Sequence, residues 1–167
     1  MTLYLLRHGL AVEPGTAGLS RDSDRPLTAE GERKLAKIAK AMQALELSFD
    51  VILSSPYVRT RQTAQIIARA LDYRKKVEFS DALMPGGSTR KLITQLKQTD
   101  SFPENVLLVG HEPYLSELIA LLVSGDTGLS VVMKKGGLCK LTTESLEHGR
   151  CAALEWLLTP KQLVLMA

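Results

Sequence analysis

The sequence lacks the features that mark several large classes of protein. Its formal net charge is only +3, with acidic and basic residues interspersed, and this mild balance argues against nucleic acid as a partner. No apolar run approaches the length of a membrane span. The N-terminal apolar run Leu3–Leu6 is interrupted by Arg7 and His8, which argues against a secretory signal. We therefore expect a cytoplasmic protein that binds neither nucleic acid nor a membrane.

Cysteine is also scarce, since the chain holds only two, Cys139 and Cys151. Their spacing is not that of metal ligands, and we expect no metal site. They could face each other across neighbouring strands, but reduced core thiols are the usual state in a cytosolic protein. No repeat, low-complexity tract or linker divides the chain, so its 167 residues indicate one domain over 1–167 with a substantial core.

Apolar runs typical of strands alternate with amphipathic helical patterns along most of the chain. Strands are predicted at 3–6, 49–53, 77–79, 105–109, 131–133, 138–141 and 153–157, and helices at 29–45, after Pro56, after Ser88 and from Pro113 to about 123. Thr28 and Ser88 are the predicted N-caps of the helices that follow them. This alternation predicts an α/β fold, with a mostly parallel sheet between helices on both faces. The strands of the last third would complete the sheet or form its antiparallel edge.

Arginine and histidine side chains follow two of the predicted strands, at the point where each strand ends. Arg7, His8 and Gly9 come directly after the first strand, and His111 follows the strand 105–109. Parallel α/β sheets bind ligands outside the carboxyl ends of their strands, so both histidines would lie at one edge. A histidine beside an arginine there can act as a nucleophile toward a phosphate-like anion. Taken alone, the tripeptide could equally mark a strand end entering solvent.

Two further features fit an anion site at this edge. Arg59 and Arg61 fall in the first turns of the helix after Pro56, where a cation faces the positive end of the helix dipole unless an anion lies nearby. A solvent-facing arginine is an equally good explanation of either one. The polar connection 10–27 is long for a compact domain, and it could form a wall of the site.

Four segments, in this order along the chain, resemble the histidine phosphatase superfamily, which includes the phosphoglycerate mutases. Arg7-His8-Gly9 resembles its signature, and residues 25–31 are similar to the start of its first helix. Residues 55–64 resemble the second motif, and this match assigns the second phosphate-binding arginine to Arg59 rather than Arg61. Residues 109–111 resemble the third motif, which carries the second histidine.

The chain length, residues 136–138, residues 156–160 and the lack of long insertions are similar to the short SixA-type phosphohistidine phosphatases. The resemblance implies a three-layer, phosphoglycerate mutase-like fold. It also implies that His8 takes up the phosphoryl group, that Arg7 and Arg59 hold its oxygens, and that His111 donates a further hydrogen bond. Arg25 would be an auxiliary ligand. The neighbouring arginines would help keep His8 neutral, and no cofactor or metal would be needed.

The sequence departs from this family at the general acid. Mutase-type relatives carry a glutamate after the third strand, where this chain has Asp81 as its only carboxylate. Other branches place an aspartate directly after the second histidine, where this chain has Glu112. Either residue could donate a proton, and either could merely cap a helix.

The resemblance favours a monomeric phosphatase that acts on a phosphohistidine-bearing protein, such as a phosphotransfer domain or a phosphocarrier. A small-molecule phosphomonoesterase on the same fold is the first alternative. A non-catalytic module that binds phosphate or phosphoproteins is the second, but such a module would not need His8 at the attacking position. The uncertain general acid favours phosphohistidine, because imidazole leaves readily whereas an alkoxide depends on a positioned acid.

Overall fold

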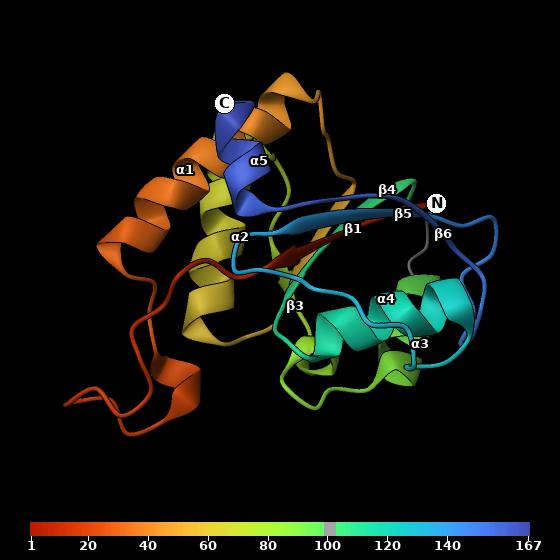
Figure 1. The fold of residues 1–167 in the computed structure, drawn as a ribbon, viewed down its shortest axis with the longest axis horizontal. Helices are drawn as coiled ribbons and strands as arrows, with labels where there is room; N and C mark the ends of the chain where they lie inside the picture. Colours follow the sequence, from red (N-terminus) through yellow and green to blue (C-terminus); the bar gives the residue numbers. More distant parts are fainter. Residues whose placement is uncertain (99–102) are drawn as a thin grey trace.

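The fold is built on a six-stranded mixed sheet, seen in a computed structural model that describes residues 1–98 and 103–167. The strands are β1 (Thr2–Arg7), β2 (Val51–Ser54), β3 (Glu78–Phe79), β4 (Asn105–Gly110), β5 (Leu138–Thr142) and β6 (Ala153–Leu158), in the order β3-β2-β4-β1-β5-β6. The first four strands pair in parallel, and β5 is antiparallel to both of its neighbours. The predicted parallel sheet with an antiparallel edge is therefore confirmed (Figure 1).

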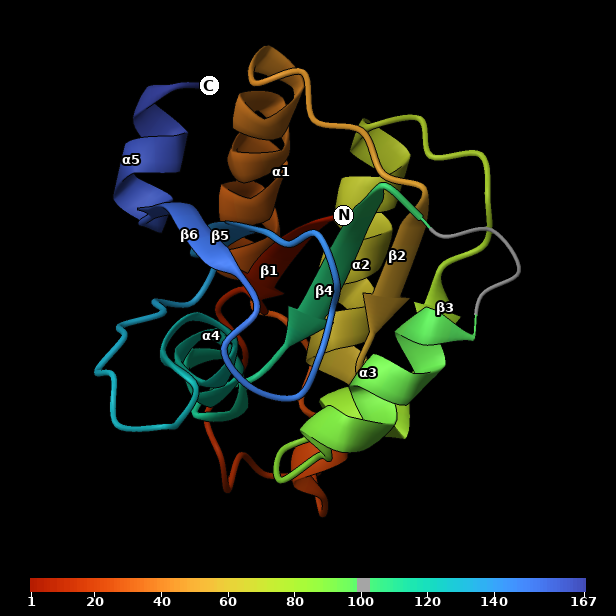
Figure 2. The ribbon, with the colours of Figure 1, turned by 90° about the vertical axis from the view of Figure 1, so that its right-hand side faces the viewer.

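Helices cover both faces of this sheet, as Figure 2 shows. The five helices of the described residues are α1 (Ala29–Ala44), α2 (Val58–Ala70), α3 (Thr89–Lys97), α4 (Tyr114–Ser124) and α5 (Pro160–Leu165). One apolar core lies between the sheet and α1, α2 and α5, and the other lies between the sheet and α3 and α4. Within the described residues, no helix combines the length and the apolar character needed to span a membrane.

Helices α1 and α3 begin at the N-cap residues predicted for them, Thr28 and Ser88. The Thr28 hydroxyl accepts a hydrogen bond from the Gly31 amide at 3.0 Å, and the Ser88 hydroxyl accepts one from the Lys91 amide at 3.3 Å. Each bond satisfies one of the amides that a helix leaves unpaired in its first turn. Both N-caps follow directly from the residue type ahead of an amphipathic pattern, so both were predictable and both are confirmed.

The prediction of a strand at 131–133 is wrong, because this segment pairs with no strand of the sheet. Both edges of β1 are already occupied, by β4 and by β5. The segment crosses the carboxyl end of β1 instead, and the Met133 carbonyl accepts a hydrogen bond from the Arg7 side chain at 2.7 Å. Helix α5 was not predicted, and Thr159 starts it with a capping box.

The two cysteines form no disulfide: Cys139 is buried within β5 and Cys151 is half-buried ahead of β6. The connection 10–27 lies beyond the carboxyl ends of the parallel strands, at the lower left of Figure 1. It contains one short 3-10 helix, Asp22–Asp24, and its ends meet through a bridge between Ala11 and Leu27. This placement agrees with the predicted wall at the edge that follows β1 and β4.

Candidate active site

The two histidines are brought together by the register of β1 and β4. Arg7 lies opposite Gly110 in this parallel pair, so His8 and His111 each follow one step beyond the paired residues. Their ring centroids are 5.3 Å apart, and both side chains are buried. The adjacent Gly9 packs against α1, because a Cβ at this position would lie 2.6 Å from Leu35 Cδ1. Packing against the helix thus gives a reason for glycine here.

His8 is held in one orientation by contacts at both of its ring nitrogens. Its Nδ1 lies 2.7 Å from the Gly9 carbonyl oxygen, which can only accept, so Nδ1 carries the proton and Nε2 carries the lone pair. The Arg59 Nε–H donates to this Nε2 at 3.4 Å. The pKa of His8 is lowered to about 3, mainly by burial; the charges of Arg59, Arg7 and Lys135 act in the same direction, and the Gly9 bond opposes them. The neutral state agrees with the sequence prediction, but burial contributes more to it than the arginines do.

Arg59 lies in the first turn of α2 and is almost fully buried. Its Nη1 donates to the Asp22 carbonyl at 2.7 Å, and its Nη2 donates to the Asp22 carboxylate at 2.9 Å. The same carboxylate accepts from Arg25 Nε at 2.8 Å and from its Nη2 at 2.7 Å. The Asp22 carboxylate therefore provides the anion that offsets the unfavourable position of Arg59 at the positive end of the α2 dipole. Its burial opposes ionisation, but the bonds from Arg25 and Arg59 outweigh that and lower its pKa.

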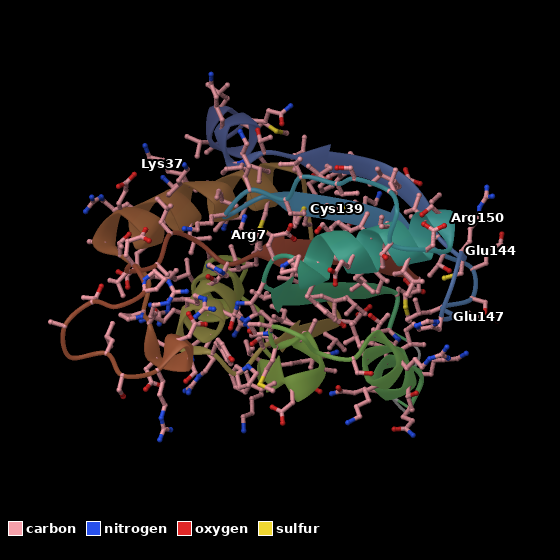
Figure 3. The ribbon with its side chains drawn as sticks, turned by 60° about the horizontal axis from the view of Figure 1, so that its bottom comes forward. Arg7, Lys37, Cys139, Glu144, Glu147 and Arg150 are labelled. Carbon is pink, nitrogen blue, oxygen red and sulfur yellow. The ribbon has the colours of Figure 1, made fainter. Side chains whose placement is uncertain are left out.

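Arg7 is the last residue of β1 and is half-buried (Figure 3). Its Nη1 is held by the Met133 carbonyl, and its Nε is buried without a hydrogen-bond partner. Burial lowers the pKa of Arg7, and the nearby Glu112 carboxylate opposes this. The Arg7 guanidinium thus remains a cation, and its buried Nε–H is a donor available to a bound anion.

His111 is fixed by two residues of the segment that leads into α2. Its Nε2 lies 2.8 Å from the Ser55 hydroxyl, and the Tyr57 ring packs edge-on at 5.0 Å. Its Nδ1 is buried and has no partner. Burial lowers the pKa of His111 to about 3, and the charge of Arg59 acts in the same direction. His111 is therefore neutral at pH 7, and only one of its nitrogens can donate.

These groups line one pocket of about 320 Å³ at the carboxyl edge of the sheet. Its walls are Arg7, His8, Glu13, Pro14, Asp22, Arg25, Arg59, Pro85, His111, Glu112 and Lys135. A groove of about 550 Å³ between α1 and α2 is larger, but it contains none of the histidines. The chemistry of the lining, rather than the volume, identifies the candidate site.

The structure separates the alternatives that the sequence left open. Arg59 enters the pocket, whereas Arg61 lies outside the lining, with its guanidinium 5.5 Å from the centroid of the exposed Phe79 ring. Glu112 lines the pocket, and its Oε1 accepts the Ser116 amide at 3.0 Å in the first turn of α4. Asp81 is exposed and does not line the pocket.

Sequence reasoning missed several residues of this site: Glu13, Asp22, Ser55, Tyr57 and Lys135, together with the Met133 carbonyl. Ser55 and Tyr57 belong to the motif at 55–64 and could have been found there. The only indication for Asp22 was that it is an acidic residue in the long connection 10–27, which directly follows Arg7, His8 and Gly9. Nothing in the sequence indicated Lys135 or the carbonyl, because their positions depend on how the last third of the chain packs.

Comparisons with known proteins agree with this geometry. A model of the histidine phosphatase superfamily (branch 1) matches residues 3–84. An uncharacterised protein of Picosynechococcus sp. is 37% identical over 142 residues, which make up 84% of either chain. The chain belongs to the histidine phosphatase superfamily. Membership confirms the family resemblance and, together with the similarity to SixA proteins described next, supports a phosphatase hydrolase.

Within the histidine phosphatase superfamily, the chain is similar to SixA proteins. Phosphohistidine phosphatase SixA of Escherichia coli is 27% identical over 76% of this chain and 77% of its own length. The structure of the protein histidine phosphatase SixA complexed with tungstate matches with a TM-score of 0.83 and 25% identity, over 98% of this chain and 99% of the other. A phosphoserine phosphatase of Entamoeba histolytica, 18% identical with a TM-score of 0.70 over 97% and 98% of the chains, shares the fold.

Proposed function

We propose that this protein is a phosphohistidine phosphatase that dephosphorylates a histidine on another protein. The state of His8 carries the proposal: a buried, neutral imidazole with Nδ1 fixed on a carbonyl and the Nε2 lone pair beside a guanidinium. A lone pair held in this way suits attack on phosphorus. The similarity to SixA over most of both chains supports the same function.

The reaction takes two displacement steps. In the first, His8 Nε2 forms a bond to phosphorus as the bond from phosphorus to the substrate imidazole breaks. The substrate imidazole leaves as a neutral ring, because its other nitrogen takes up a proton from solvent. In the second, water attacks phosphorus, the bond to His8 breaks, and phosphate is released with the proton of the water passing to solvent. Arg7 and Arg59 stabilise the phosphoryl oxygens in both steps, since preorganised donors in a partly desolvated site act where charge develops.

The carboxylates of the pocket favour a substrate with a good leaving group. Asp22 is bound to two arginines that lower its pKa, which makes it a poor proton donor. The Glu112 carboxylate accepts a hydrogen bond from the Ser116 amide, which is the contact expected of a residue that caps the start of α4. An alkyl phosphate needs a positioned acid to protonate the departing alkoxide, whereas the substrate imidazole can be protonated on its other nitrogen by solvent and then leaves as a neutral ring. We infer that Asp81 has no part in catalysis, since it lies outside the pocket.

Charge neutralisation in the pocket is supplied by the protein itself. Arg7, Arg25, Arg59 and Lys135 provide four cationic groups around His8. Within the described residues, no group of three or more metal-ligating side chains forms a metal site. Phosphoryl transfer requires stabilisation of the equatorial oxygens, and guanidinium groups can provide it. We infer that the enzyme needs neither a metal nor a cofactor and that it acts as a monomer.

A small phosphorylated metabolite is the second candidate substrate. The volume of about 320 Å³ lies at the low end of roughly 300–1,000 Å³ for small-molecule sites. The phosphoserine phosphatase of Entamoeba histolytica shows that the fold also serves small substrates. The two candidates differ in the leaving group, and kinetics can separate them.

The test compares kcat/KM for a phosphotransfer domain carrying phosphohistidine, an aryl phosphate and small sugar or glycerate phosphates. We expect the first two to be cleaved, and His8→Ala to abolish both activities. Quenching a reaction with labelled substrate should leave an acid-labile, base-stable phosphate on the peptide that contains His8. Faster cleavage of an alkyl phosphate would overturn the phosphohistidine assignment, and near-normal turnover by His8→Ala would overturn the mechanism.

A further inference from the structure

His111 Nε2 is already engaged, which limits how this histidine can contact a phosphoryl group. The Ser55 hydroxyl lies 2.8 Å from Nε2, and both side chains are buried. The other ring nitrogen, Nδ1, is buried and has no partner. A hydrogen bond from His111 to a bound anion can therefore come only from Nδ1, and only if Nδ1 carries the proton.

The direction of the Ser55–His111 bond follows from the other contacts of the hydroxyl. The Ser55 Oγ accepts a hydrogen bond from the Tyr57 amide at 3.4 Å. Among the described residues, His111 Nε2 is the one acceptor within reach of the Ser55 O–H. Because a buried hydroxyl normally donates its proton, Ser55 donates to Nε2. A neutral imidazole that accepts at Nε2 carries its proton on Nδ1.

We propose that Ser55 is a positioning residue that fixes His111 as the Nδ1–H tautomer, so that Nδ1–H serves as a donor to the phosphoryl oxygens. The proposal rests on the proposed function for the identity of the anion. It gives the two histidines complementary roles set by their neighbours. The Gly9 carbonyl fixes the His8 lone pair at Nε2, where it accepts from Arg59 at 3.4 Å, and the Ser55 hydroxyl leaves His111 with a free proton at Nδ1.

The tautomer can be read directly from a long-range ¹H–¹⁵N correlation spectrum of the labelled wild-type protein at pH 7. The chain holds three histidines, so His8→Ala and His148→Gln spectra complete the assignment. We expect a protonated Nδ1 and an unprotonated Nε2 for His111. A protonated Nε2 would overturn the proposal, and this measurement requires neither catalysis nor a variant at Ser55.

A matched pair of serines separates positioning from general stability. Ser54 and Ser55 are neighbours at the end of β2 and are both fully buried, but the Ser54 hydroxyl bonds to the Ser55 carbonyl at 2.9 Å and does not touch His111. We expect Ser55→Ala to weaken tungstate binding, measured by calorimetry, roughly three- to tenfold, the value of one net hydrogen bond. Ser54→Ala should bind tungstate as the wild type does.

A double-mutant cycle shows whether Ser55 acts through His111. In a His111→Ala background, Ser55→Ala should cause no further loss of tungstate affinity. Equal affinities for Ser54→Ala and Ser55→Ala, or an undiminished Ser55 effect in the His111→Ala background, would contradict the proposal. Should the wild type bind tungstate with the expected tautomer and yet fail to cleave phosphohistidine, the proposed function fails while the assignment of Ser55 stands.

Discussion

Lowering the pH from 7 to 5 should destabilise this protein through its two buried histidines. Burial lowers the pKa of both His8 and His111 to about 3. In the unfolded chain, a histidine has a pKa of about 6.5. Between these values the unfolded state binds protons that the folded state does not, so the free energy of unfolding falls as the pH falls. The loss begins near pH 6.5 and continues to about pH 3.

The size of the loss follows from the two pKa values. At pH 5, a histidine with a pKa of about 6.5 unfolded and about 3 folded costs about 2 kcal/mol relative to pH 7. His111 has the same shift, so the pair would cost about twice this amount. The rings are 5.3 Å apart and both face the Arg59 charge, so protonating one makes protonation of the other harder. A loss of this size is a large fraction of the stability of a typical domain, roughly 5–15 kcal/mol.

Urea unfolding at pH 7 and pH 5 measures this loss, and variants isolate the contribution of each histidine. The wild type should lose about 2 kcal/mol more than His8→Gln between the two pH values, because glutamine does not titrate. His148 is exposed in the turn between β5 and β6, so His148→Gln is a matched control that should lose as much as the wild type. Comparing losses between pH values cancels any constant effect of the substitution.

Equal losses in the wild type and His8→Gln would refute this reasoning, because they would mean that His8 takes up its proton in the folded state as easily as in the unfolded one. Inorganic phosphate at saturating concentration provides a second check. An anion beside His8 offsets the charges of Arg7 and Arg59, which contribute to the lowered pKa. We therefore expect phosphate to reduce the difference between wild type and His8→Gln.

Three further predictions concern the phosphate-binding role of Arg59, the independence of activity from metal ions, and the packing of Gly31 against the connection 10–27. Arg59→Ala should lose roughly 10²–10³ in kcat, as for one donor to a developing oxyanion, whereas Arg61→Ala should retain near wild-type kcat; equal losses would mean that Arg61 also binds. Exhaustive chelation should leave kcat/KM unchanged, and a loss restored by one divalent ion would contradict metal independence. Gly31→Ala would place a Cβ 2.2 Å from the Leu10 carbonyl oxygen and should destabilise the fold by about 1–3 kcal/mol, measured by urea unfolding; an unchanged midpoint would contradict this.

Most of the sheet and its helices could be predicted because their signals are local. The run Val106–Val109 within β4 is apolar and fully buried, as expected for a strand covered on both faces. The edge on which the histidines meet also followed from the sequence, since parallel strands end on the same side. The segment 131–133 has the same β-branched, apolar character, but both edges of β1, the strand that it crosses, are already occupied. Local propensity does not report which edges are already occupied.

The contacts inside the site were harder to predict for the same reason. Asp22 reaches Arg59 only because the connection 10–27 folds back over the carboxyl end of the sheet. The cause of the low His8 pKa was also misjudged, since the sequence shows the neighbouring arginines but not the burial that contributes most. The side chains at the other end of the molecule, such as Glu144, Glu147 and Arg150 in Figure 3, are charged too, and their types alone would not exclude them from a site.

The arrangement of charges connects the state of the nucleophile with the substrate it suits. An ionised carboxylate next to His8 would raise its pKa and promote the imidazolium form, which has no lone pair for attack. Of the three carboxylates that line the pocket, Asp22 is bound to Arg25 and Arg59, Glu112 is bound to the start of α4, and Glu13 is exposed. The contacts of Asp22 and Glu112 that help keep His8 neutral also make these two residues poor donors to an alkoxide. Under the proposed function this is no disadvantage, because the departing group is itself an imidazole, whose other nitrogen can take its proton from solvent so that the ring leaves as a neutral base.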